Sequence, residues 1–111
     1  MKSLIVVFAA IGLIGCGSSS AEGDKSISLA YVEWDTEVAS THVIAEVLEQ
    51  EGFNVKTTPL DNAVMWESIA NSEADAMVAA WLPATHEAQY EQYKDKVVDL
   101  GVNLTGAKIG L

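Results

Sequence analysis

Short apolar segments of strand type alternate with segments of helical spacing along most of the 111 residues, and this alternation restricts the fold more than any other feature. Such alternation, with short links, predicts an α/β fold in which helices pack on a mostly parallel sheet, and the length allows one domain at most. The expected strands are residues 27–34, 54–58, 75–81 and 97–100, with a strand-like segment at 107–111. The expected helices lie between Asp35 and Gly52, from Asp61 past Ile69, and from Pro83 through Tyr93. Because the last strand-like segment stops at the final residue, we expect the chain to be the first part of a longer protein.

The first residues form a separate segment. Lys2 precedes an apolar run from Leu4 to Ile14, which is shorter than the roughly 20 residues that cross a bilayer and is typical of a signal peptide. The sequence LIGC, which ends at Cys16, resembles the lipobox of bacterial lipoproteins, in which the cysteine receives a diacylglycerol and becomes the mature N-terminus. We therefore expect a signal peptide at 1–15, a lipidated, Gly- and Ser-rich tether at 16–26, and a folded lobe at 27–111. The resemblance implies a protein anchored to the cell membrane and facing outside the cytoplasm.

Composition excludes several classes of function. Acidic residues outnumber basic ones by 16 to 6, which gives a formal net charge of −10 and argues against binding to nucleic acid. One cysteine and two histidines leave no plausible set of zinc ligands, and no Gly-rich phosphate loop is present. Ser40 and Thr41 lie beside His42, but neighbours on a helix point in different directions and form no nucleophile–base pair. The sequence predicts no enzyme, no metal site and no cofactor.

Two tryptophans carry the strongest functional signal. Trp34 and Trp81 each end a predicted strand, and open parallel sheets bind ligands just outside the carboxyl ends of their strands. If the strand order is 2-1-3, these strands are neighbours about 4.8 Å apart, and both indoles project from one edge. Aromatic faces attract a quaternary ammonium group, which has no N–H to donate. The carboxylate of a betaine needs a further partner, and without arginine the candidates are helix N-terminal amides and His86.

Each of these residues also has an ordinary structural interpretation. Trp34 and Trp81 could both pack in the core, and His86 could be a surface residue of the helix that follows Pro83. Trp66 lies inside the second predicted helix, beside Met65, and is expected to be core.

Three segments resemble one known family. The segments are AYVEWDTEVASTHV (30–43), MWESIANSEADAMVAAWLPATH (65–86) and YKDKVVDLGVNLTGAKIGL (93–111), and they are similar to substrate-binding lipoproteins of glycine betaine ABC transporters. The resemblance implies one lobe of the two-lobed type II periplasmic-binding-protein fold. It places Trp34 and Trp81 at two positions of a three-tryptophan cage and His86 against the ligand carboxylate. The third tryptophan belongs to the opposite lobe, so we expect this chain alone to bind betaine weakly.

The expected function is that of a lipid-anchored solute-binding component, which delivers glycine betaine or a related quaternary ammonium osmoprotectant to the permease of an ABC importer. Two alternatives stay open. One is a ligand-free lipoprotein domain whose acidic face contacts another protein, and the other is a binder of choline or carnitine.

Overall fold

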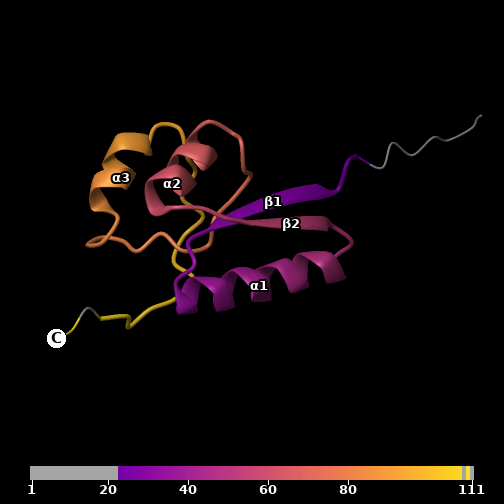
Figure 1. Ribbon diagram of the computed structural model, residues 1–111, viewed down its shortest axis with the longest axis horizontal. Helices are drawn as coiled ribbons and strands as arrows, with labels where there is room; N and C mark the ends of the chain where they lie inside the picture. The colour runs from indigo at the N-terminus through magenta and orange to yellow at the C-terminus, as the bar shows by residue number, and fades with distance from the viewer. Residues whose placement is uncertain (1–22, 109, 111) are drawn as a thin grey trace, which may run out of the picture.

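The structure of the protein is a computed structural model that describes residues 23–108 and 110. The predicted signal peptide, Cys16 and most of the predicted tether lie outside these residues. The described elements are β1 (Ser26–Tyr31), α1 (Asp35–Gln50), β2 (Asn54–Pro59), α2 (Asn62–Ala70) and α3 (Glu87–Tyr93), arranged as in Figure 1. None of the helices in these ranges has the combination of length and hydropathy that crossing a bilayer requires.

A short parallel sheet organises the fold. β1 and β2 pair in parallel, with Ser26 opposite Asn54 and Tyr31 opposite Pro59. On the other edge of β1, Leu29 forms a parallel bridge with Ala76, and the Ala30 N–H donates to the Ala76 carbonyl oxygen at 3.0 Å. The third segment therefore lies beside β1, which meets the condition of a 2-1-3 order, and the α/β class is confirmed.

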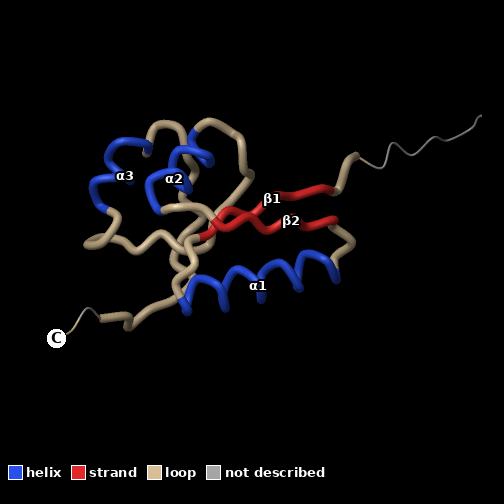
Figure 2. The backbone as a smooth tube through the Cα atoms, viewed as in Figure 1, coloured by secondary structure: helices blue, strands red, loops and turns tan. Residues whose placement is uncertain are grey.

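The two faces of β1 pack against different helices, because successive side chains of a strand point to opposite faces. Ala30 and Val32 contribute to a core cluster with Met65 and Trp66 of α2. On the other face, the Tyr31 ring contacts the His42 ring of α1 edge-on, at a centroid distance of 5.7 Å. α1 therefore runs along one side of the sheet, while α2 and α3 gather near the carboxyl ends of the strands (Figures 1 and 2).

Five of the predicted elements are wrong in extent or in kind. The first strand ends at Tyr31, three residues before its predicted end at Trp34. Residues 75–81 contribute only the bridge at Ala76, and the carbonyl oxygen of Val78 instead accepts a hydrogen bond from Asn103 Nδ2 at 2.6 Å. Residues 97–100 and 107–108 form no strand, because no strand of the described part of the chain supplies partners for their backbone groups. Residues 109 and 111 of the predicted last segment lie outside the described residues. The helix predicted from Pro83 begins only at Glu87. The intervening residues form turns, including one in which the His86 N–H donates to the Trp81 carbonyl oxygen.

Candidate functional site

Four aromatic side chains meet near the carboxyl end of the sheet, and we refer to Trp34, Trp66, Trp81 and His86 as the aromatic cluster. The ring centroids of Trp34 and Trp81 are 4.8 Å apart, with their planes inclined at 53°. The His86 imidazole stacks on Trp34 at 5.8 Å and 22°, and its centroid lies 6.3 Å from that of Trp81. Trp66 meets the imidazole edge-on at 5.6 Å. Three residues that the sequence singles out are thus brought together from separate segments of the chain.

The turn after β1 positions Trp34. The Trp34 N–H donates to the Val32 carbonyl oxygen at 2.8 Å, and the Trp34 carbonyl oxygen accepts the Val38 N–H at 2.9 Å. Trp34 is therefore the N-cap residue of α1, with an extended backbone. The chain leaves the strand and enters the helix within three residues, which keeps the indole at the edge of the sheet.

A second turn joins Trp81 to His86 by two hydrogen bonds. The His86 N–H donates to the Trp81 carbonyl oxygen, and the Trp81 N–H donates to His86 Nδ1, both at 2.9 Å. Because Nδ1 accepts a hydrogen bond, the neutral imidazole carries its proton on Nε2. That nitrogen is buried and has no hydrogen-bond partner among the described residues. His86 thus holds one unused N–H donor inside the aromatic cluster.

Burial differs sharply within the cluster. The Trp81 side chain is 40% exposed and Trp34 is partly buried, whereas Trp66 and His86 are 1% and 0% exposed. Loss of hydration disfavours the charged imidazolium, so burial lowers the pKa of His86 below its usual value of 6.5. At neutral pH the cluster therefore presents two accessible indoles over a neutral histidine.

Acidification is expected to destabilise the fold through His86. Because the pKa is lower in the folded state, the unfolded chain takes up the proton first as the pH falls. The contribution of neutral His86 to the free energy of unfolding is fully present above about pH 6.5. It declines below that pH, by at most about 1.4 kcal/mol per pH unit for one group. Denaturant unfolding at a series of pH values measures this decline.

His86→Gln is expected to flatten the stability profile between about pH 5 and about pH 7, since the titrating group is gone. His42→Gln is the matched control, because it removes the other histidine of the chain, which is exposed on α1. An equal slope in wild type and His86→Gln would contradict the assignment.

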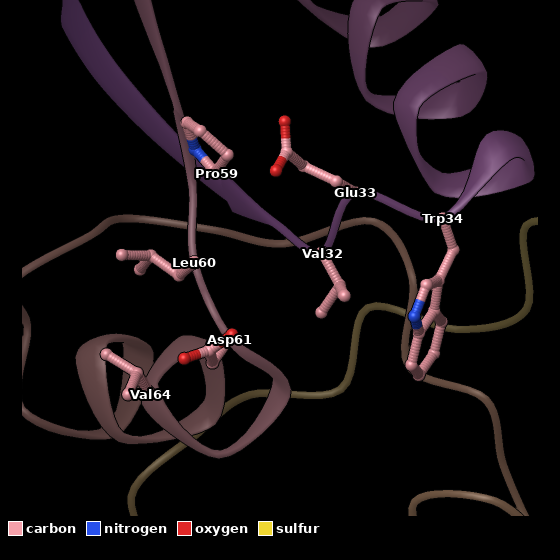
Figure 3. Close-up of a pocket in the computed structure, with 7 residues that line it drawn as sticks. All are labelled: Val32, Glu33, Trp34, Pro59, Leu60, Asp61 and Val64. Carbon is pink, nitrogen blue, oxygen red and sulfur yellow. The ribbon is translucent and has the colours of Figure 1, made fainter.

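A groove lies beside Trp34, at the carboxyl ends of β1 and β2. It has a volume of about 460 Å³, and Figure 3 shows its lining. The lining residues are Val32, Glu33, Trp34, Pro59, Leu60, Asp61 and Val64. The groove therefore combines an apolar floor and one indole with two carboxylates, a surface suited to an organic cation rather than an anion. The described residues hold no group of three His, Cys, Asp or Glu side chains that could bind a metal ion.

Two contacts of the site escape prediction from the sequence. Trp66 is core, as expected, but its ring also meets the His86 ring edge-on. Glu37 accepts a hydrogen bond from the Val32 N–H through Oε2 at 3.0 Å and so reaches the turn that carries Trp34. Glutamate three residues after a helix N-cap is typical of a side chain that reaches back to the preceding backbone, and this spacing was the available signal.

Comparison with known proteins identifies the class. Residues 25–111 match the family described as the substrate-binding domain of the ABC-type glycine betaine transport system. The chain is 50% identical over 95 residues to the glycine betaine/carnitine transport binding protein GbuC of Listeria monocytogenes serotype 1/2a (strain 10403S), covering 86% of this chain and 31% of that protein.

Two solved structures are similar to this fold. One is lactococcal OpuAC in its closed-liganded conformation complexed with glycine betaine, with a TM-score of 0.72 and 52% identity over 75% of this chain and 33% of that one. The other is the glycine/betaine/L-proline-binding protein (ProX) of Borrelia burgdorferi, with a TM-score of 0.68 and 35% identity over 70% of this chain and 29% of that one.

These matches define an α/β part of a transport substrate-binding protein. The chain belongs to the family of substrate-binding domains of ABC-type glycine betaine transport systems. It spans about a third of the length of the relatives it matches.

Proposed function

We propose that this chain contributes part of the ligand site of a solute-binding component of an ABC importer for glycine betaine or a related quaternary ammonium osmoprotectant. The observation that carries the proposal is the contact of Trp34 with Trp81, at a centroid distance of 4.8 Å, directly over a neutral histidine. In this proposal the two indoles contact the methylated nitrogen and His86 contacts the carboxylate. The names of the relatives, which include glycine betaine and carnitine, support the same ligand class.

The indole pair suits a cation that cannot donate hydrogen bonds. A ring face attracts such a cation by about 0.5–2 kcal/mol, and more strongly when water is excluded. The rings of Trp34 and Trp81 already touch, so a trimethylammonium group fits against their outer faces or displaces one ring. Trp81, with 40% of its surface exposed, has the greater freedom to move.

His86 offers the chemistry that a carboxylate needs. Its Nε2–H is a donor without a partner among the described residues, and leaving a buried donor unpaired costs about 1–3 kcal/mol. A ligand carboxylate that reached Nε2 would remove this cost. Since Trp34 and Trp81 lie against the imidazole, a shift of one indole would have to accompany that contact.

The remaining parts of the proposal rest on the sequence. They are a signal peptide at 1–15, lipid attachment at Cys16, a tether at 16–26, the binding lobe at 27–111, location at the membrane outside the cytoplasm, and delivery of ligand to an ABC permease. We propose a non-enzymatic role without a cofactor, since the matched relatives are transport binding proteins.

Titration of the chain with glycine betaine tests the proposal. Tryptophan emission is expected to change with betaine but not with tert-butylacetate, which has the same shape without the positive charge. Calorimetry is expected to give a dissociation constant weaker than about 1 μM, because water still hydrates the side of the cation that the two indoles leave open. Identical responses to the two compounds would contradict cation recognition and favour the alternative of a protein contact surface.

Carnitine is a second candidate ligand, because the Listeria relative is named for both compounds. Carnitine shares the trimethylammonium and carboxylate groups, so competition with betaine for one tryptophan signal is expected. Choline lacks the carboxylate and would leave His86 Nε2 unpaired, so it is expected to compete less well.

A further inference from the structure

A buried carboxyl group lies beneath the turn that carries Trp34. Glu37, on the first turn of α1, is 1% exposed and makes a hydrogen bond through Oε2 to the Val32 N–H at 3.0 Å. Its other oxygen, Oε1, is buried and has no hydrogen-bond partner among the described residues. Burial raises the pKa of Glu37, and the hydrogen bond from Val32 opposes this rise in part.

This arrangement is costly for a group that only fills space. A buried carboxyl that is incompletely hydrogen-bonded lowers stability, and an apolar side chain of similar size would pack at the same position without that cost. Among the described residues no ion pair involves Glu37, so no positive charge compensates its buried carboxyl group. The carboxyl group does accept a hydrogen bond from the backbone between β1 and Trp34. This contact indicates a structural role in the turn that carries Trp34.

The hydrogen bonds connect Glu37 to Trp34 through one residue. Glu37 accepts the N–H of Val32, and the carbonyl oxygen of Val32 accepts the N–H of Trp34 at 2.8 Å. Both backbone polar groups of Val32 are therefore occupied, one by the helix side chain and one by the tryptophan backbone. Without the carboxylate, the Val32 N–H would have no partner among the described residues. The turn would then keep only the hydrogen bond between the Trp34 N–H and the Val32 carbonyl oxygen.

We propose that Glu37 is a positioning residue, which holds the Val32–Trp34 turn and thereby fixes the Trp34 indole against Trp81 and His86. An effect of Glu37 on betaine affinity rests on the proposed function, in which Trp34 contacts the cation. The positioning of Trp34 by Glu37 is independent of that function, because it is a property of the ligand-free chain.

The chain offers matched variants for a test. Glu37→Met removes the acceptor but keeps an unbranched side chain of similar length, whereas Glu37→Gln keeps an acceptor oxygen. Thr41→Val is the control for general disturbance of the helix. Thr41 lies one turn further along the same buried face, is 0% exposed, and its hydroxyl oxygen has no partner among the described residues.

Two readouts on the full, ligand-free chain separate positioning from stability. Circular dichroism reports the exciton couplet of two indoles in contact, here Trp34 and Trp81. Hydrogen exchange reports protection of the Val32 amide, with the Ala30 amide as internal control, because it is held by the Ala76 carbonyl oxygen instead. We expect Glu37→Met to lose the couplet and the Val32 protection while the Ala30 protection stays. Glu37→Gln and Thr41→Val are expected to keep all three.

A folded Glu37→Met chain that retains the couplet would overturn the proposal, as would an equal loss in Thr41→Val. If Glu37→Met does not fold, Glu37→Asp replaces it, because a side chain one methylene shorter keeps the charge but withdraws from Val32. An unchanged couplet in Glu37→Asp would then overturn the proposal. Betaine titration distinguishes the two levels: a lost couplet with unchanged betaine affinity supports positioning by Glu37 and counts against the ligand role of Trp34.

Discussion

Replacing Trp66 by alanine is expected to lower the free energy of unfolding by about 3–5 kcal/mol. The indole is 1% exposed and packs in the main core cluster with Ala30 and Met65. Its removal therefore reduces the buried apolar surface and also creates a cavity. A small domain has a total stability of only about 5–15 kcal/mol, and the variant is therefore close to unfolding. Denaturant unfolding followed by far-ultraviolet circular dichroism measures the effect.

Val64→Ala is the control on the same helix. Val64 is 46% exposed, so its truncation is expected to change the free energy of unfolding by no more than about 0.5 kcal/mol. A loss below about 1 kcal/mol in Trp66→Ala would show that the indole does not fill the core. Trp66→Phe is expected to fall between the two variants, since a smaller ring fills part of the space.

The first half of the fold follows from local signals in the sequence. The predicted strand 54–58 corresponds to β2 at Asn54–Pro59, and the helix expected between Asp35 and Gly52 corresponds to α1 at Asp35–Gln50. Gly52 ends this region with a φ of +88°, a conformation that favours glycine. Strand composition, helix periodicity and helix-terminating residues each depend on a few neighbouring positions. They can therefore be recognised from the sequence alone.

The second half depends on contacts between distant residues. The apolar run 75–81 indicates burial, and the segment does lie beside β1, but a strand also needs a continuous partner. β1 ends at Tyr31, and the side chain of Asn103 occupies the carbonyl oxygen of Val78, so pairing stops after Ala76. Neither event is visible in the local pattern of residues 75–81.

The site shows the same division. Trp34, Trp81 and His86 could be expected at one edge because parallel strands place their carboxyl ends together. The depth of His86 and its contact with Trp66 could not, because they depend on how α2 packs beneath the turn at residues 81–86. A sequence can therefore indicate which side chains meet, whereas the extent to which each of them is buried depends on tertiary packing.

Removing the Trp81 indole is expected to weaken betaine binding by roughly ten- to thirtyfold, where the other lobe is present to close over the ligand. The magnitude corresponds to about 1.4–2 kcal/mol for one ring against a desolvated cation. A suitable protein is a chimera in which residues 27–111 replace the matching third of the Listeria relative, to which this chain is 50% identical. Calorimetry with glycine betaine compares the chimera with its Trp81→Ala and Trp34→Ala variants.

Phe53→Ala is the matched control for this comparison. Phe53 is also a partly exposed aromatic residue, but it precedes Asn54 at the opposite end of β2, away from Trp34 and Trp81. Its loss is expected to leave betaine affinity within about twofold, because no cation–π contact is removed. Equal weakening in Phe53→Ala and Trp81→Ala would mean that the indoles stabilise the lobe without touching the ligand. Weakening confined to Trp34→Ala and Trp81→Ala would instead assign recognition of the positively charged ligand to these two rings. Trp34 and Trp81 come from separate segments of the chain and contact each other at the edge of the sheet.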